Sequence, residues 1–126
     1  MDEKRVLVFG TFDGLHPGHH FFLRSAKTNG THLSVSVARD AHVRELKNKV
    51  SVDREQERLR RVSDLSFVDE AFLSDEELGT FSVLENARPD LIILGHDQEA
   101  LEASLRLWME SCELYIPIKR LPKIAR

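Results

Sequence analysis

The sequence predicts an α/β fold in which one parallel, five-stranded sheet is wound on both faces by helices. Short apolar runs alternate along the chain with amphipathic runs of helical length, as in a doubly wound sheet. One apolar run, Leu91–Leu94, is aliphatic throughout, which is typical of a strand that is buried on both faces. The 126 residues, of which 41% are hydrophobic, suffice for one domain and are too few for two.

The first three elements follow from their local patterns. Residues 5–9 are predicted to form a strand, residues 17–29 a helix and residues 33–38 a second strand. The helix opens with a proline, which suits the first helical turn, and Gly30 ends it. The second strand alternates aliphatic residues with serines, so we expect it to be covered on one face only.

The remaining elements complete the alternation of strands and helices. We expect, in order, a flexible charged loop around residues 44–49, a helix at 53–65, a strand at 67–73, a helix at 80–87, a strand at 91–94, a helix at 99–111 and a strand at 114–118. Asp53 followed by Gln56 is typical of a helix N-terminus, and Gly95 ends the fourth strand. With right-handed crossovers these strands form a Rossmann-like sheet, in which ligands bind outside the carboxyl ends of the strands.

Composition narrows the classes of function. The formal net charge is −3, and this balance predicts no nucleic-acid partner, so any phosphate binding must come from local clusters. The single cysteine, Cys112, forms no internal disulfide, which fits a reducing compartment. Residues 1–4 do not resemble a signal peptide or a membrane span. We therefore expect a cytoplasmic protein without a membrane partner.

The most informative segment is GTFDGLHPGH, residues 10–19. It places His16 and His19 three residues apart, where the first strand turns into a helix. Side chains at this spacing share a helix face, and free backbone N–H groups at a helix N-terminus favour an anion. Gly18 between the histidines lets a ligand approach the backbone closely. The segment therefore predicts a phosphate-binding site.

This segment resembles the nucleotidyltransferases of the cytidylyltransferase-like superfamily, in which a first strand ending in G-T-F-D is followed by H-x-G-H. The resemblance extends from about residue 6 to residue 117 and implies a single nucleotidyltransferase domain, residues 1–126. It implies that an acceptor phosphate oxygen attacks the α-phosphorus of a nucleoside triphosphate and that pyrophosphate leaves. His16 and His19 would donate to phosphate oxygens. The nucleotide is expected to lie against Gly10, Thr11, Phe12, Asp13 and Gly18.

Two other segments resemble parts of this family. Gly95-His96-Asp97-Gln98 is similar to the G-x-D-Q variant of archaeal-type FAD synthases, which implies nucleotide contacts by Gly95 and Asp97. The Asp97 carboxylate would receive a ribose hydroxyl or a base amino group, or help to hold a metal, unless it is an ordinary helix N-cap. Lys47 and Lys49 have the spacing of the lysine pair that meets phosphate groups in glycerol-3-phosphate cytidylyltransferases. The alternative for either lysine is a place in a solvated loop.

Other basic residues supply further candidates. Arg39 and Arg58 are the expected acceptor-binding residues, and Arg58 falls at an arginine position of the cytidylyltransferases. The Ser/Thr-rich motif that usually follows the last strand in this family is not found in the sequence. Either this sequence stops short of a tail that carries it, or Lys119 and Arg120 would hold the triphosphate in its place. Magnesium is expected with the triphosphate, although the sequence shows no dedicated metal cage. Asp13 would assist a hydrated magnesium ion or stabilise its turn.

The resemblance favours an adenylyltransferase that uses ATP and FMN, similar to FAD synthase. A cytidylyltransferase that uses CTP and glycerol 3-phosphate, or another sugar or alcohol phosphate, is the alternative, because these enzymes share most of the motifs. A non-catalytic nucleotide-binding regulatory protein is the alternative from another class, since the Ser/Thr-rich motif is missing. A homodimer is expected, as is usual in the family.

Overall fold

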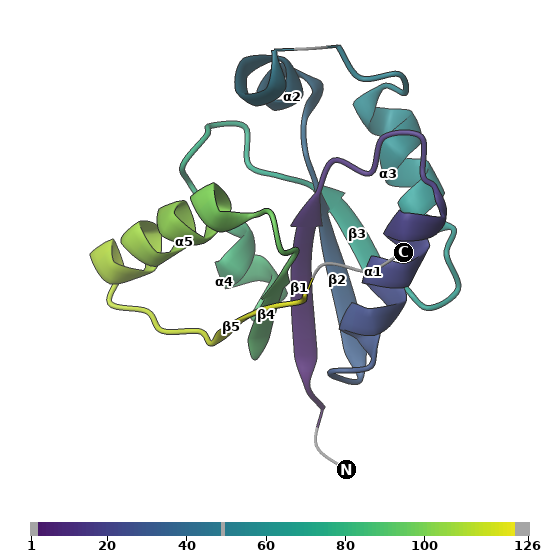
Figure 1. The fold of residues 1–126 in the computed structure, drawn as a ribbon. Coiled ribbons are helices and arrows are strands. Elements are labelled where there is room, and N and C mark those ends of the chain that lie inside the picture. The colour runs from purple at the N-terminus through teal and green to yellow at the C-terminus, as the bar shows by residue number, and fades with distance from the viewer. Residues whose placement is uncertain (1–2, 49, 123–126) are drawn as a thin grey trace.

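Five parallel strands form one sheet in the order β3-β2-β1-β4-β5 (Figure 1). The computed structural model describes residues 3–48 and 50–122. The strands are β1 (Arg5–Gly10), β2 (His32–Val37), β3 (Glu70–Leu73), β4 (Leu91–Leu94) and β5 (Ile118–Arg120). The helices are α1 (Pro17–Lys27), α2 (Asp40–Lys47), α3 (Glu55–Ser63), α4 (Val83–Ala87) and α5 (Glu99–Ser111). The predicted doubly wound class is confirmed.

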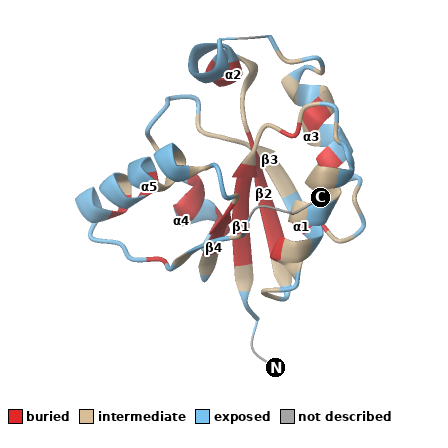
Figure 2. Cartoon of the chain, in the orientation of Figure 1, coloured by how far each residue is buried: buried red, intermediate tan, exposed pale blue. Residues whose placement is uncertain are grey.

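The side chains of β1 alternate between two apolar cores, one on each face of the sheet. One core lies under α1 and α3, and its buried residues include Val8 of β1 and Leu23 of α1. The other lies under α4 and α5, and its buried residues include Leu7 of β1 and Leu105 of α5. Figure 2 shows that the buried residues are concentrated in β1, β2 and β4. The carboxyl ends of these strands are therefore held by packing on both faces.

Strand β2 is covered on both faces, contrary to the one-sided burial expected from its serines. Ser34 and Ser36 are each 1% exposed. The Ser34 hydroxyl donates to the Glu70 carboxylate of the neighbouring β3 at 2.9 Å, so this polar side chain is satisfied within the sheet. The aliphatic residues of β2 belong to the core under α1 and α3. The serines of β2 therefore lie on one face of the sheet and its aliphatic residues on the other, and both faces are covered.

The connection between β2 and β3 contains two helices. Helix α2 covers most of the segment that was expected to be a charged loop. It buries His42 and Val43, and the local sequence does not indicate this burial. Helix α3 begins at Glu55, later than the expected start at Asp53. The backbone N–H of Asp53 donates to the Asp13 carboxylate at 2.8 Å, which keeps this residue in the preceding loop.

Strand β5 begins later than the expected range of 114–118. Its first residue, Ile118, pairs with Ile92 of β4, whereas Tyr115 is 78% exposed. The expected strand residues 114–117 therefore lie outside β5. Strand β3 and helix α4 are shorter than expected, while β4 and α5 have the expected bounds.

Replacing Leu105 with alanine is expected to lower the free energy of unfolding by about 2–5 kcal/mol, because it leaves a cavity in the core under α4 and α5. Leu107 lies on the same helix but is 70% exposed, so Leu107→Ala should change this free energy by less than about 0.5 kcal/mol. Urea unfolding followed by circular dichroism measures both values. Equal losses in the two variants would contradict this assignment of the core.

Candidate active site

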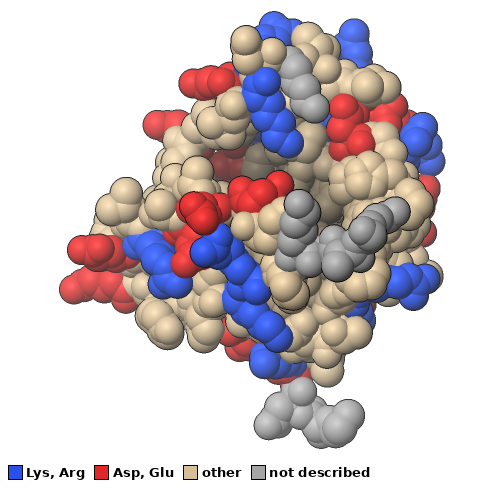
Figure 3. Space-filling view, in the orientation of Figure 1, with Lys and Arg blue, Asp and Glu red and all other residues tan. Residues whose placement is uncertain are grey.

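A cavity of about 550 Å³ lies at the carboxyl ends of β1 and β4. It is lined by the loops at residues 10–13, 95–98 and 121–122, by the beginning of α1 and by Lys47 of α2. Figure 3 shows the corresponding hollow on the surface between α2 and α5. Ligands of parallel α/β sheets bind at this edge, so the cavity is the candidate active site.

His16 and His19 begin helix α1 and line this cavity. The His16 Nδ1 accepts a hydrogen bond from the Gly18 N–H at 3.1 Å, and the His19 Nδ1 accepts one from the His16 N–H at 3.2 Å. The two rings stack with their centroids 3.7 Å apart. A backbone N–H only donates, so each Nδ1 lacks a hydrogen and each neutral ring carries its hydrogen on Nε2. Both rings therefore offer an N–H donor beside a helix N-terminus, where anions bind.

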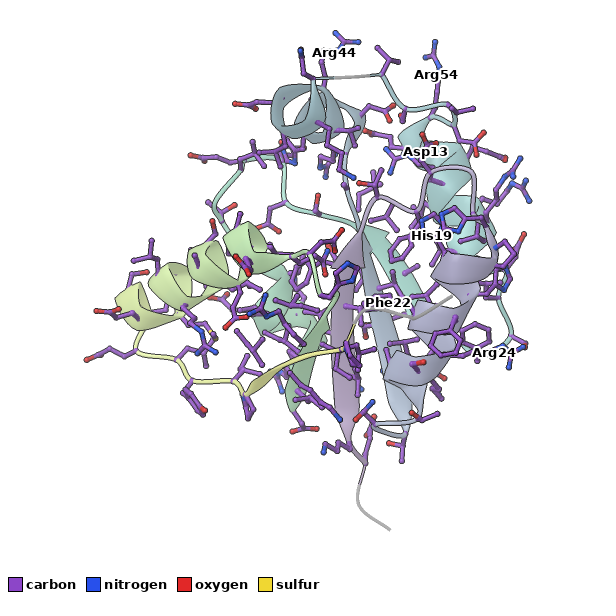
Figure 4. All side chains as sticks on the ribbon, in the orientation of Figure 1. Asp13, His19, Phe22, Arg24, Arg44 and Arg54 are labelled. Carbon is purple, nitrogen blue, oxygen red and sulfur yellow. The ribbon has the colours of Figure 1, made fainter. Side chains whose placement is uncertain are left out.

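The His19 ring is neutral at physiological pH. Burial of the ring, together with electrostatic interactions with His16 and Lys47, lowers the pKa of His19 from 6.5 to about 4. The Asp13 carboxylate, which Figure 4 shows near His19, acts in the opposite direction and is outweighed. The neutral state agrees with the hydrogen bond from His16, because a protonated Nδ1 would no longer accept it.

Packing against aromatic rings requires glycine at two positions in this segment. A Cβ atom on Gly10 would lie 2.5 Å from the Phe12 ring, and a Cβ atom on Gly18 would lie 2.9 Å from the His16 ring. Phe12 is 5% exposed and meets the His19 ring edge to face, with the centroids 5.5 Å apart. Because these two residues lack a Cβ atom, the rings of Phe12 and His16 can pack directly against the backbone.

The loop after β1 is tied to the segments beside it. The two oxygens of Asp13 accept hydrogen bonds from the backbone N–H groups of Val52 and Asp53 at 2.7 and 2.8 Å. These bonds tie the turn after β1 to the segment before α3. Lys47 at the end of α2 donates from Nζ to Thr11 Oγ1 at 3.0 Å, which brings its ammonium group to the cavity.

Gln98 joins the ends of β1 and β4. Its Oε1 accepts a hydrogen bond from the Gly95 N–H at 2.7 Å, and its Nε2 donates to the Phe9 carbonyl at 3.0 Å. Gln98 is also the N-cap residue of α5, so Asp97 is not the helix N-cap. The Asp97 side chain lines the cavity and has no hydrogen-bond partner among residues 3–48 and 50–122. The sequence analysis did not predict that Gln98 joins the two strands. The only indication in the sequence is an amide side chain just after the end of β4.

The two arginines expected to bind the acceptor do not line this cavity. Arg39 lines a separate cavity of about 350 Å³, and its Nε donates to the Ser74 carbonyl at 2.6 Å. Arg58 is 0% exposed, and its guanidinium group donates to four protein oxygens. The prediction that Arg58 contacts the acceptor is wrong, because no part of its side chain reaches the surface.

The basic residues near the C-terminus also lie outside the cavity. Lys119 donates from Nζ to the side-chain oxygen of Asn29 at 3.1 Å. Arg120 pairs with two carboxylates of α5, at 3.4 and 3.2 Å, which offset its charge. The structure therefore does not place either residue where a triphosphate in the cavity would meet it. Lys49 lies outside the described residues.

Residues 3–48 and 50–122 contain no group of three or more His, Cys, Asp or Glu side chains that could hold a metal ion. Two carboxylates line the cavity, of which Asp13 binds backbone N–H groups and Asp97 is exposed. In the same part of the chain, no helix has both the length and the apolar character needed to cross a membrane.

The fold and this site define a Rossmann-like α/β domain in which two histidine rings at the start of the first helix line a cavity at the carboxyl ends of the strands. The profile of the Cytidylyltransferase-like family matches residues 7–122, and the chain belongs to this family. The resemblance seen in residues 10–19 is thereby confirmed.

Relatives of the chain include proteins named FAD synthase. The FAD synthase of Methanopyrus kandleri is 42% identical over 128 aligned positions, which cover 98% of this chain and 83% of that protein. The FAD synthase of Methanococcoides burtonii is 46% identical over 94 residues, which cover 75% of this chain and only 64% of that protein. Among solved structures, the lipopolysaccharide core biosynthesis protein from Thermoplasma volcanium superposes with a TM-score of 0.88 at 35% identity, covering 98% of this chain and all (100%) of that one.

The His19 imidazole is expected to titrate with a midpoint at about pH 4, because burial and neighbouring charges disfavour its protonated form. Titration of the ring protons by NMR measures this midpoint directly. Between pH 6.5 and about 4 the unfolded chain binds a proton that the native ring does not, so stability falls as the pH is lowered through this window. His19→Asn should reduce this fall. A midpoint near 6.5 in the native protein would contradict the description of the site.

Proposed function

We propose that this chain is a nucleotidyltransferase that transfers AMP from ATP to FMN, with FAD and pyrophosphate as products. The observation that carries the proposal is the stacked pair of His16 and His19, whose Nε2–H donors belong to rings that line the cavity at the N-terminus of α1. The relatives named FAD synthase support ATP and FMN as the substrates.

In the proposed reaction, an oxygen of the FMN phosphate attacks the α-phosphorus of ATP. A new phosphorus–oxygen bond forms there, the bond to the oxygen that bridges the α- and β-phosphates breaks, and pyrophosphate leaves with that electron pair. The phosphate of FMN is largely ionised at neutral pH, so the reaction needs neither a protein base nor a protein nucleophile. The protein has to align the two phosphates and stabilise the charge that develops between them.

His16 and His19 supply that stabilisation as neutral donors. Each ring is held at Nδ1 by a backbone N–H, which leaves Nε2–H for a phosphate oxygen. Neither ring has to gain or lose a proton in this role. The ammonium group of Lys47 adds a positive charge from the end of α2, where it donates to the Thr11 hydroxyl.

The segment after β4 is proposed to bind the nucleoside part of ATP. Gly95 presents its backbone at the cavity, and the Asp97 carboxylate is available to accept a hydrogen bond from a ribose hydroxyl or a base amino group. Magnesium would accompany ATP as part of the substrate, and Asp97 is the cavity carboxylate that would contact it if it does not bind the ribose or base. A phosphate contact by Lys49, a cytoplasmic location and a homodimer stay predictions.

His16→Asn is expected to lower kcat by about 10²–10³-fold, the usual cost of losing one donor to a developing oxyanion. Asparagine is a favourable helix N-cap, so this variant removes Nε2–H while the start of α1 is kept. The measurement is pyrophosphate release with MgATP and FMN, alongside the melting temperature. His20→Ala is the matched control, because His20 lies directly after His19 on α1 and does not line the cavity, and the kcat of this variant should stay within about twofold.

The same assay separates the proposed activity from its alternatives. ATP and CTP are each combined with FMN, glycerol 3-phosphate and a sugar 1-phosphate. Turnover only with CTP and an alcohol or sugar phosphate would replace FMN adenylylation with cytidylyltransfer. Nucleotide binding without turnover for any pair would contradict the proposal and favour a non-catalytic nucleotide-binding protein. Equal activity of the His16→Asn variant and the unmodified chain would exclude the donor role of His16.

A further inference from the structure

Arg58 is the largest fully buried side chain among the described residues, and it carries a permanent positive charge. A buried guanidinium group is costly unless its N–H groups are bonded and its charge is paired. The Nε atom donates to the Asp53 carbonyl at 3.0 Å, and Nη2 donates to the Asp40 carboxylate at 2.7 Å. The Nη1 atom donates to two further carbonyls, those of Thr11 at 2.9 Å and Ala38 at 2.7 Å. The network therefore satisfies four of the donors and supplies the opposite charge.

These four acceptors belong to the segments that follow β1 and β2 and to the loop before α3, and of these residues Thr11 lines the cavity. Thr11 lies in the loop between β1 and the histidines, and Ala38 follows the end of β2. Asp40 is the first residue of α2, the helix that ends with Lys47. Arg58 thus connects β1, β2 and the start of the helix that carries the cavity's lysine.

Asp40 extends this connection into the loop before α3. Besides Arg58, its carboxylate accepts hydrogen bonds from the Ser51 hydroxyl at 3.0 Å and from the Glu55 N–H at 3.2 Å. Burial acts to raise the pKa of Asp40, but the hydrogen bonds from Arg58, Glu55 and Ser51 hold it below its ordinary value. The carboxylate therefore stays ionised and paired with Arg58 at neutral pH.

Thr11 is held from two sides by cations that differ in exposure. The buried Arg58 binds its carbonyl oxygen, and the exposed Lys47 binds its hydroxyl at 3.0 Å. We infer that Arg58 is a positioning residue: it fixes Thr11 and the start of α2, and so holds the Lys47 ammonium where a nucleoside triphosphate meets it. This inference rests on the phosphate-binding role of Lys47 in the proposed function.

A lysine at position 58 should not replace the arginine. Its single ammonium group lacks the planar fork that reaches three carbonyls and a carboxylate at once. Arg58→Lys keeps the charge and releases part of the network, so Thr11 and α2 lose their fixed positions. Arg58→Lys should then weaken nucleotide binding only because it displaces Lys47.

The test is a double-mutant cycle in which the dissociation constant of MgATP is measured by calorimetry on the full chain. Lys47→Ala is expected to raise this constant by about 10–100-fold, the range for a lost hydrogen bond to a charged group. Arg58→Lys alone should raise it by about 10-fold, and by no more than about twofold in the Lys47→Ala background. Arg60→Lys is the matched control, because Arg60 lies exposed on the same helix and pairs with Glu57, and it should leave the constant within about twofold.

A purely structural role for Arg58 would give a different pattern. Equal losses of affinity in both backgrounds, or unchanged affinity in a folded Arg58→Lys variant, would overturn the inference. If Arg58→Lys does not fold, Asp40→Asn takes its place in the cycle, since it removes the paired charge and keeps the size of the side chain. The proposed function fails separately: binding of MgATP without turnover contradicts the transferase activity and leaves the role of Arg58 intact.

Discussion

The hydrogen bonds that two imidazole Nδ1 atoms accept from backbone N–H groups determine how this site is built. They satisfy two of the donors that any helix leaves unpaired at its start, so the histidines begin α1 themselves. They also fix the tautomer, since a ring that accepts at Nδ1 carries its hydrogen at Nε2. One pair of contacts therefore supplies the helix cap, fixes both rings and leaves their Nε2–H groups as donors for a ligand.

The same principle holds at the other strand ends, where side chains rather than regular backbone pairing fix the loops. Gln98 uses both ends of its amide to join β1 to β4, and Asp13 uses both carboxylate oxygens to hold the segment before α3. Arg58 joins β1 to β2 from below the surface. Loops beyond the strand ends have no regular backbone hydrogen bonds to hold them. These side chains therefore provide the rigidity that a site for phosphate transfer needs.

Local patterns in the sequence were sufficient wherever local physics decides the structure. The aliphatic run of β4 and the histidine segment at α1 are examples, because burial on both faces and helix capping act over a few residues. The burial of Arg58 and its hydrogen bonds were not predictable in this way, since its partners lie up to 47 residues away in the chain. Helix α2 was missed for a related reason: its buried residues, His42 and Val43, are stabilised by tertiary contacts rather than by a strong local pattern. An isolated sequence shows the charge of an arginine and not whether that charge is already paired.

The charge lining the cavity shows why a basic sequence is unnecessary for a site of this kind. Among the described residues, Lys47 is the one lysine or arginine that lines the cavity, whereas Asp13 and Asp97 also line it, and the His19 ring is neutral. Binding of a triphosphate there would depend on the ring N–H donors of His16 and His19, on the single ammonium group of Lys47 and on the counterion that accompanies the substrate, not on an excess of protein cations. Directed N–H donors require each phosphate oxygen to lie in a defined place, which a diffuse positive charge does not. A chain with a net charge of −3 therefore suits this chemistry, because alignment, more than attraction, is what in-line displacement at phosphorus needs from the protein.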